Sequence, residues 1–106
     1  MTDINLDKLD VVNNAASNRF EIKIGDHLAI LDYRQRESSI DLKHTEVPAA
    51  LEGHGLGAKL AHAALEFAKA EGLTVRASCP YVAAYIKRHP EYEVLTHRDT
   101  SGTPEF

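Results

Sequence analysis

The chain has 106 residues, of which 43% are hydrophobic and 26% charged, and this is the composition of one small globular domain. Such a length buries enough surface for one hydrophobic core but not for two, so we expect any site on the rim of that core. The net charge of −4 disfavours a general electrostatic hold on nucleic acid or on an anionic membrane, and we expect neither as a partner.

The sequence carries no signal for export, membrane insertion or metal binding. No apolar run is long enough to span a bilayer, and the first residues are acidic where a leader would be basic and then apolar. The lone cysteine, Cys79, cannot form an internal disulfide and suits a reducing compartment. The six histidines have no spacing that places two metal ligands one helical turn apart. We therefore expect a soluble, cytoplasmic protein without a metal site.

The first half of the chain predicts three antiparallel strands in succession. The first eighteen residues are polar and are interpreted as an arm that leads into the fold. Alternation of apolar and polar residues then begins, and Gly25 and Asp26 supply the turn of a hairpin. The strands are expected at 20–24, 27–34 and 40–47. In the second strand, the side with Ala29, Leu31 and Tyr33 is the more apolar and is expected to face the core.

The second half of the chain predicts alternating helices and strands. Apolar residues recur at helical spacing over 55–71, and Gly72 is the expected stop of this helix. Because the chain crosses over through a helix, the strand expected at 73–79 is predicted to run parallel to the third strand. Pro80 is expected to open a second helix that continues to about Arg88. A last short strand is expected at 92–96.

These elements predict one α+β (mixed α/β) domain over residues 11–97. It consists of an antiparallel β-meander followed by a β-α-β-α-β unit, with the main helix directly after a glycine-rich turn. Residues 1–10 and 98–106 are expected to be a flexible N-terminal arm and a flexible C-terminal tail.

The most informative segment is the glycine-rich turn Glu52-Gly53-His54-Gly55-Leu56-Gly57, between a predicted strand and a predicted helix. Glycines let successive amide hydrogens point into one concavity at the positive end of the helix dipole, where an anion such as phosphate binds. A plain helix cap is the alternative. The nucleotide-triphosphate loop does not fit, because Gly57 is followed by Ala58 and Lys59. A dinucleotide fold does not fit either, since no acid ends the next strand.

Three motifs resemble the GNAT acyltransferase superfamily, in which Gln or Arg, two residues, Gly, one residue and Gly open the main helix. They are Val47-Pro48-Ala-Ala-Leu-Glu-Gly53-His-Gly55-Leu-Gly57, the entry His44-Thr-Glu-Val-Pro, and Cys79-Pro80-Tyr81 followed by His89-Pro90-Glu91-Tyr92. Together they look like the small GNAT-like acetyltransferase family, and the resemblance covers about residues 11–96. Two departures are that Glu52 stands where Gln or Arg is usual and that the chain has no room for the superfamily's first strand and first helix pair. The resemblance thus implies a truncated GNAT-like fold.

The resemblance implies an N-acetyltransferase that binds acetyl-coenzyme A and passes its acetyl group directly to an unidentified amine. The amides of residues 53–58 are then expected to receive the pyrophosphate, with the pantetheine between the strands that end near Val47 and Cys79. Lys59, Lys87 and Arg88 are expected to add positive charge for the phosphates, although each also fits an ordinary solvated charge. The implied cofactor-binding residues are Val47, Gly53, His54, Gly55, Leu56, Gly57, Ala58, Lys59, Cys79, Tyr85, Lys87 and Arg88.

Five residues are candidates for the catalytic steps. Tyr85 aligns with the tyrosine that protonates the departing thiolate, and Tyr81 is a second candidate because the motif register slips by one residue. His44 and Glu46 lie two apart, hence on one strand face, and either is a candidate for the general base. Cys79 is a candidate for facing the thioester or accepting the acetyl group, because it ends a strand and precedes a helix start. A small buried apolar side chain is the alternative role for this cysteine.

Two further functions stay open on the sequence. A noncatalytic acyl-coenzyme A binding or sensing module would explain the missing acceptor-side elements. A protein-interaction domain would use the glycine turn only as a cap, consistent with Glu52 at its start. Pairing as a homodimer is one way to complete an open site and cover a sheet edge.

Overall fold

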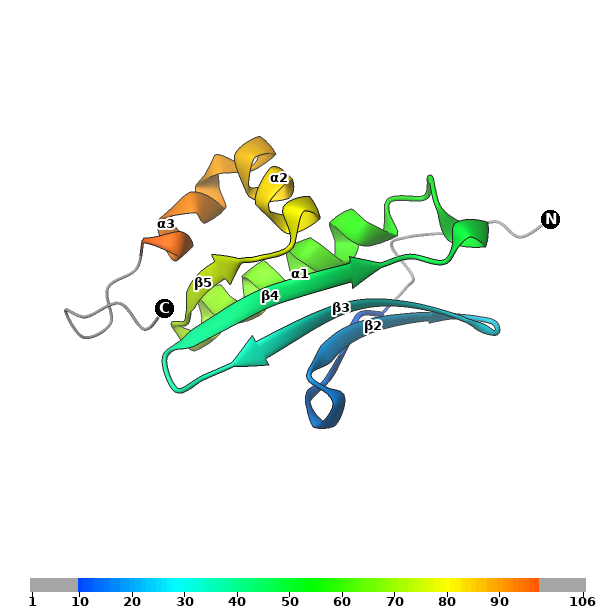
Figure 1. Cartoon of the computed structure of the whole chain (residues 1–106), viewed down its shortest axis with the longest axis horizontal. Coiled ribbons are helices and arrows are strands. Elements are labelled where there is room, and N and C mark those ends of the chain that lie inside the picture. The colour runs from blue at the N-terminus through cyan, green and yellow to red at the C-terminus, as the bar shows by residue number, and fades with distance from the viewer. Residues whose placement is uncertain (1–9, 98–106) are drawn as a thin grey trace.

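The computed structural model describes residues 10–97, so the flexible segments expected at residues 1–9 and 98–106 lie outside the described residues. The described chain forms a five-stranded sheet in the order β1-β2-β3-β4-β5 (Figure 1). Its strands are β1 (Val12–Asn14), β2 (Arg19–Ile24), β3 (His27–Gln35), β4 (Ser39–Glu46) and β5 (Thr74–Ala77). Strands β2 to β4 pair antiparallel and β5 pairs parallel to β4, as the sequence predicts, and β1 is an additional strand that pairs antiparallel with β2.

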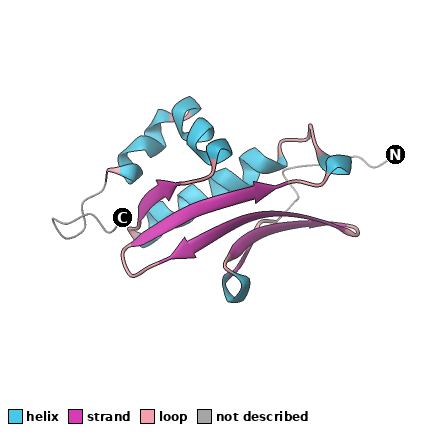
Figure 2. Ribbon diagram, viewed as in Figure 1, coloured by secondary structure: helices cyan, strands magenta, loops and turns pink. Residues whose placement is uncertain are grey.

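The α-helices lie between and after the last two strands, and one short 3₁₀ helix lies between β1 and β2 (Figure 2). The α-helices are α1 (Leu56–Glu71), α2 (Pro80–Arg88) and α3 (Glu93–Thr96). The short 3₁₀ helices are η2 (Ala15–Ser17), η3 (Ala49–Leu51) and η4 (Pro90–Tyr92). The predicted α+β class is therefore confirmed, with the main helix directly after the glycine-rich turn.

Helix α1 covers one face of the sheet, because one side of the helix is apolar along its length. It contacts β2, β3, β4 and β5, and in Figure 1 it runs behind them. Leu60, Ala64 and Ala68 follow helical spacing and are fully buried. Gly72 ends the helix at a left-handed φ of 69°, with its N–H bonded to the carbonyls of Ala68 and Lys69. The predicted helix and its glycine stop are confirmed.

The core lies between α1 and the inner face of the sheet. Ala29, Leu31 and Tyr33 of β3 are buried on that face, as the alternation predicts. Their neighbours Phe20 and Ile22 on β2 are buried with them, opposite Leu31 and Ala29 in the strand register. Burying each large apolar side chain contributes about 1.5–3 kcal/mol, so this cluster holds the strands that support the glycine turn.

Strand β4 carries a β-bulge in its middle. Leu42 pairs with Tyr33 and His44 pairs with Asp32, so Lys43 has no partner residue on β3. An extra residue in one strand moves the following side chains to the opposite face. Before the bulge, even-numbered residues such as Ile40 and Leu42 therefore face the core, and after the bulge the odd-numbered residues face this side.

Strands β4 and β5 part at their C-terminal ends. The last hydrogen bond between them runs from the Cys79 N–H to the Leu42 carbonyl, at 3.0 Å. Beyond this bond β4 continues to Glu46 and pairs with β3 alone. The segment that follows β5 instead turns into α2 at Pro80. This separation opens the sheet beside the glycine-rich turn. In open sheets, a crevice outside the carboxyl ends of the strands is a common place for a ligand.

The strand expected at 92–96 is wrong, because this segment forms η4 and the helix α3. Tyr92 and Leu95 are buried three residues apart, whereas Val94 between them is 66% exposed. Burial at this spacing suits a helical turn and not a strand. Helix α3 contacts β5, where a further strand would otherwise pair.

A polar cluster fixes η4 to α1. The Tyr92 hydroxyl donates to Glu66 Oε2 at 2.6 Å and lies 2.9 Å from His62 Nδ1. Because the hydroxyl proton goes to Glu66, the bond to His62 requires a proton on Nδ1. Burial, and then the bond to the Glu66 carboxylate, raise the pKa of Tyr92. These bonds are the tertiary contacts that favour a helical end to the domain.

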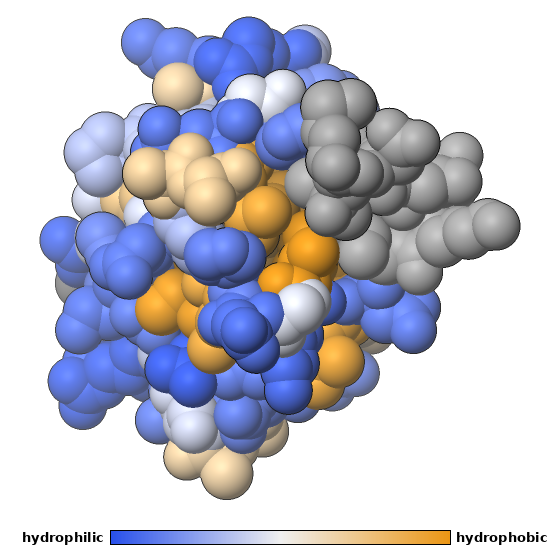
Figure 3. Space-filling view, turned by 90° about the vertical axis from the view of Figure 1, so that its right-hand side faces the viewer, coloured by the Kyte–Doolittle hydropathy of each residue, from blue (hydrophilic) through white to orange (hydrophobic). Residues whose placement is uncertain are grey.

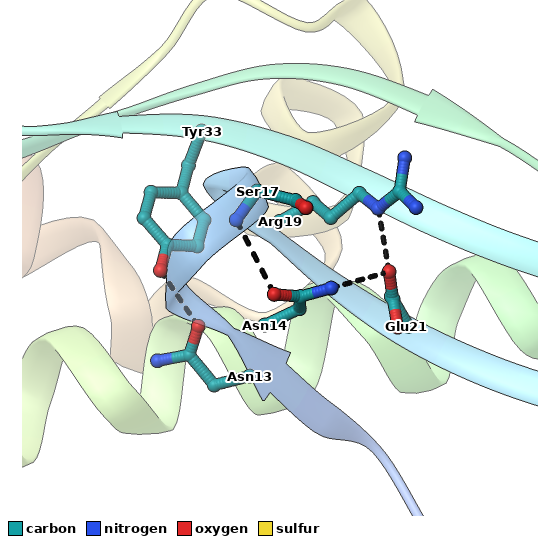
Figure 4. A network of polar contacts seen from close by, with 6 residues as sticks. All are labelled: Asn13, Asn14, Ser17, Arg19, Glu21 and Tyr33. Carbon is teal, nitrogen blue, oxygen red and sulfur yellow. Dashed lines mark hydrogen bonds and ion pairs between the residues drawn. The ribbon is translucent and has the colours of Figure 1, made fainter.

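The arm expected over the first eighteen residues is wrong for its second half, which forms β1 and η2. The Asn14 side chain accepts a bond from the Ser17 N–H at 3.2 Å and caps η2. The Tyr33 hydroxyl donates to the Asn13 side chain at 2.6 Å (Figure 4). These side-chain bonds attach β1 to the sheet, and the polar composition of the segment does not reveal them.

Glu21 is the centre of the same network and gives the domain a pH-dependent contact. Its Oε2 accepts bonds from Arg19 at 2.6 Å and from Asn14 at 3.0 Å (Figure 4). The bond from Arg19, and then that from Asn14, lower the pKa of Glu21 below its ordinary value of 4.5. A lowered pKa stabilises the fold above the unfolded value, and this stabilisation is lost as the pH falls through the folded value.

We therefore expect Glu21→Gln to lower the melting temperature at neutral pH and to have a shrinking effect in acid. Melting curves of both proteins between neutral pH and about pH 3 measure this difference. A difference that stays constant across this range would contradict the assigned role of the carboxylate.

Candidate functional site

A pocket of about 490 Å³ lies at the C-terminal end of β4. It is lined by Thr45, Val47, Leu51, Glu52, Gly53, Gly55, Leu56, Gly57 and Tyr81. These residues come from β4, the loop that follows it, the first turn of α1 and the first turn of α2. Figure 3 views the end of the molecule that carries the loop after β4, and apolar side chains gather near its centre within a hydrophilic surround. Size, apolar walls and a few polar groups are typical of a small-molecule site.

The glycine-rich turn lines this pocket, and the structure shows no backbone partner for its amides among residues 10–97. Gly53 and Gly55 have φ values of 88° and 77°, which side-chain-bearing residues rarely adopt. The first hydrogen bond of α1 runs from the Lys59 N–H to the Gly55 carbonyl at 3.1 Å, and no side chain caps the helix. Within the described chain, no backbone carbonyl accepts a bond from the amides of residues 53–58. Free amides at the positive end of a 16-residue helix are suited to an anion.

Tyr81 closes one side of the pocket by lying against Gly57. A Cβ atom on Gly57 would come within 2.9 Å of both the Cζ and the hydroxyl oxygen of Tyr81. Only glycine allows this approach, and Tyr81 keeps 40% of its surface exposed. The phenol hydroxyl therefore lies over the first turn of α1.

The bulge in β4 decides which of its side chains meets the pocket. Thr45 lines it, whereas His44 and Glu46 are exposed and lie on the opposite strand face. His44 Nε2 and Glu46 Oε1 are 3.4 Å apart, which confirms that the two share one face. The sequence singled out these two residues and missed Thr45, because a bulge leaves no mark in the alternation.

Cys79 is buried beside the pocket wall without lining it. Its Sγ lies 3.5 Å from Thr45 Oγ1. Burial acts to raise the pKa of the Cys79 thiol, but bonds from the Thr45 side chain and from the amides of Val82 and Tyr81 outweigh it, so that the pKa lies below its usual value. The expected influence of the helix start on this thiol is present as bonds from the first amides of α2.

Tyr85 lies one turn away from the pocket, among other rings. It stacks on His89 with centroids 4.1 Å apart, and on Tyr92 at 6.3 Å. Burial, and then the Glu91 carboxylate, raise the pKa of Tyr85. The pocket is lined by Tyr81, the second of the two tyrosines proposed from the sequence, and not by Tyr85.

The basic residues expected at the phosphates do not line the pocket. Lys87 and Arg88 lie in the last turn of α2, about 9–10 Å along the helix from Tyr81. Lys59 is half-buried in the first turns of α1, and His54 is exposed in the loop. Leu51 and Glu52 line the pocket instead. In the sequence, Glu52 stood out only as a departure from the superfamily motif, and Leu51 was not predicted as a site residue.

The described residues contain no group of three or more side chains that could hold a metal ion. A helix long and apolar enough to cross a bilayer is likewise absent from residues 10–97.

Comparison with known proteins finds that the chain is similar to the proteins called NATD1 in several vertebrates. The chain is 43% identical to Protein NATD1 of Gallus gallus over 55% of its own length and 53% of that protein, so it spans about half of this relative. It is 34% identical to Protein NATD1 of Danio rerio over 80% of its own length and 82% of the relative.

The fold has a solved counterpart in the solution NMR structure of a GCN5-like protein from Staphylococcus aureus. The two superpose with a TM-score of 0.64 at 30% identity, over 80% of this chain and 84% of the other. Residues 19–95 match the sequence profile of the GCN5-related N-acetyltransferases, and this range includes the pocket and both helices beside it. The chain belongs to the GCN5-related N-acetyltransferase family.

Proposed function

We propose that the chain transfers an acetyl group from acetyl-coenzyme A, bound in the pocket, to an amine. The observation that carries the proposal is the run of amides at residues 53–58 that have no backbone partner among residues 10–97, beside an apolar-walled cavity. A diphosphate needs several N–H donors in one place, and amides without a backbone partner at the positive end of α1 are suited to this role. When bound, the coenzyme supplies an activated thioester.

The remaining pocket residues suit the rest of such a ligand. Val47, Leu51 and Leu56 give apolar walls for the pantetheine chain. Thr45 lines the pocket beyond the point where β4 and β5 part. This position supports a reacting thioester near the end of β4.

The transfer itself requires two proton movements. The acetyl carbon leaves the sulfur and bonds to the amine nitrogen, so the amine loses one proton and the sulfur gains one. Tyr81 is suited to donate to the sulfur because its phenol lies in the pocket wall. His44 and Glu46 are exposed on the other face of β4, where an amine approaching from that side would release its proton.

Melting in the presence of acetyl-coenzyme A tests the binding step. A ligand at one hundred times its dissociation constant stabilises the folded state by about 2.7 kcal/mol, which gives a clear upward shift in melting temperature. A screen of amines for release of free coenzyme A thiol then tests turnover. A melting shift without thiol release would favour a noncatalytic acyl-coenzyme A binding module, and the absence of both would reject the proposal.

We expect direct transfer, without an acetyl group on Cys79. Cys79 is 4% exposed and is absent from the residues that line the pocket, whereas its neighbour Thr45 lines it. Intact-mass measurement after incubation with acetyl-coenzyme A alone should show no gain of one acetyl group. A stoichiometric acetyl adduct that maps to Cys79 and disappears on addition of amine would establish a covalent intermediate instead.

A further inference from the structure

The described residues that line the pocket carry two side-chain hydroxyls, those of Thr45 and Tyr81. The proposed transfer uses the Tyr81 phenol as a proton donor and gives the Thr45 hydroxyl no role. Thr45 lies on β4 beyond Leu42, whose carbonyl accepts the last hydrogen bond from the segment that follows β5. This is the place at which the proposed function puts the reacting thioester, so the Thr45 hydroxyl is available to a group that reacts there.

The neighbour of this hydroxyl is the buried thiol of Cys79. Thr45 Oγ1 and Cys79 Sγ are 3.5 Å apart, and either atom fits as the donor. The Cys79 sulfur also accepts bonds from the amides of Tyr81 and Val82, in the first turn of α2. Because those amides donate to the sulfur, the Thr45 oxygen is the acceptor that the structure offers to the thiol proton. When the thiol donates to Thr45 Oγ1, the hydroxyl keeps its own proton for another acceptor.

We propose that the Thr45 hydroxyl donates a hydrogen bond to the carbonyl oxygen of the bound acetyl group, and that the Cys79 thiol positions this hydroxyl by donating to Thr45 Oγ1. The inference rests on the proposed function, because it concerns the same transfer. Thr45 is then a catalytic residue, and Cys79 is a positioning residue that acts through it.

The proposed bond becomes stronger as the reaction proceeds. When the amine nitrogen bonds to the acetyl carbon, the carbonyl oxygen gains negative charge, and a donor already in place stabilises that charge. The C–S bond then breaks and the carbonyl forms again. Thr45 keeps its proton throughout, while the amine loses one proton and the sulfur gains one.

Thr45→Val removes the hydroxyl and keeps the shape of the side chain. We expect kcat to fall about 100-fold, because one donor to a developing oxyanion contributes about 100–1,000-fold. The dissociation constant of acetyl-coenzyme A should stay within about threefold, since the charge is absent from the ground state. Thr45→Ser restores the hydroxyl and should keep kcat within about tenfold of the parent protein.

Thr96→Val is the matched control for the loss of a threonine hydroxyl. Thr96 Oγ1 donates to the Glu93 carbonyl at 2.7 Å on α3, and it does not line the pocket. This variant should leave kcat and the dissociation constant within about twofold.

A double-mutant cycle tests the positioning role of Cys79. Cys79→Ala leaves the Thr45 hydroxyl free to turn, and kcat should fall about 3–10-fold with binding unchanged. Cys79→Ser supplies a new donor and should recover most of this loss. The double variant Thr45→Val/Cys79→Ala should be no slower than Thr45→Val alone, because Cys79 acts through the hydroxyl that is already missing. Independent, multiplying losses would overturn the positioning role.

Infrared difference spectra of acetyl-coenzyme A, isotope-labelled at its thioester carbonyl, test the hydrogen bond without any acceptor amine. In the parent protein the carbonyl band should lie at lower wavenumber than in free acetyl-coenzyme A, because a hydrogen bond weakens the C=O bond. The band should return toward the free value in Thr45→Val and stay lowered in Thr45→Ser. Circular dichroism shows that each variant is folded, and Thr45→Ala carries the same expectations as Thr45→Val if the valine variant does not fold.

The outcomes separate the two proposals. A parent protein that releases thiol, with kcat in Thr45→Val within threefold of the parent value or with the same carbonyl band in both proteins, would overturn the inference and leave the proposed function standing. Absence of thiol release from the parent protein with every amine would reject the proposed function, and the catalytic role of Thr45 with it.

Discussion

Replacing Gly53 with valine should abolish binding of acetyl-coenzyme A in a protein that still folds. Gly53 has a φ of 88°, so a β-branched residue forces the backbone of the turn to change and the amides to lose their common direction. A Cβ atom there meets no heavy atom within 4 Å, so the substitution creates no clash in the core. We expect a loss of about 1–2 kcal/mol of stability from the left-handed conformation. Circular dichroism and titration calorimetry measure the two effects.

Gly25→Val is the matched control for this substitution. Gly25 also has a positive φ, of 58°, and a Cβ atom there likewise meets nothing within 4 Å. It lies in the turn between β2 and β3, outside the pocket. This variant should lose a similar amount of stability and keep the affinity of the parent protein. Equal affinity in Gly53→Val and Gly25→Val would show that the glycine turn does not hold the ligand.

Replacing Tyr81 with phenylalanine should lower kcat about 100-fold, with a small change in binding. The phenylalanine ring keeps the contact with Gly57, so the pocket wall stays in place while the proton donor is removed. Steady-state kinetics with the best amine from the screen give kcat and KM separately. A drop confined to kcat distinguishes a lost proton donor from a damaged pocket.

Tyr85→Phe decides between the two candidate tyrosines. The Tyr85 ring is buried and stacked on His89, and it does not line the pocket. We expect this variant to keep kcat within about threefold of the parent protein. A large loss of kcat in Tyr85→Phe, with Tyr81→Phe fully active, would identify Tyr85 as the general acid that protonates the departing sulfur.

The sequence predicted the elements whose periodicity is long enough to be unambiguous. Strands β2, β3 and β4 follow an apolar alternation that the packing against α1 preserves, and α1 itself spans 16 residues of helical pattern. The prediction of a last strand at 92–96 failed, because a segment of five residues is too short to distinguish the periodicity of a strand from that of a helix. The hydrogen bonds from Tyr92 to α1 favour the helix. Strand β1 depends on side-chain bonds of Asn13 and Asn14, which composition cannot indicate.

The candidate site was predictable where it depends on backbone chemistry and not where it depends on strand geometry. The glycine turn stands out by residue type, and its residues Gly53, Gly55, Leu56 and Gly57 line the pocket. Thr45 was hidden because the bulge at Lys43 shifts the faces of β4. Tyr81 and Tyr85 lie one helical turn apart, so the sequence could not choose between them. In the structure Tyr81 lies against Gly57 and lines the pocket, whereas Tyr85 is buried and stacks on His89.

Chemical-shift mapping with isotope-labelled protein examines the glycine turn directly, because it reports on each backbone amide in turn. On titration with acetyl-coenzyme A, the amides of residues 53–58 should show the largest shifts, with the Tyr81 amide next. The amide of Gly25, in the distant hairpin, should stay unchanged. Binding that leaves the amides of residues 53–58 unshifted, or shifts arising chiefly elsewhere on the domain, would contradict a site built on this turn.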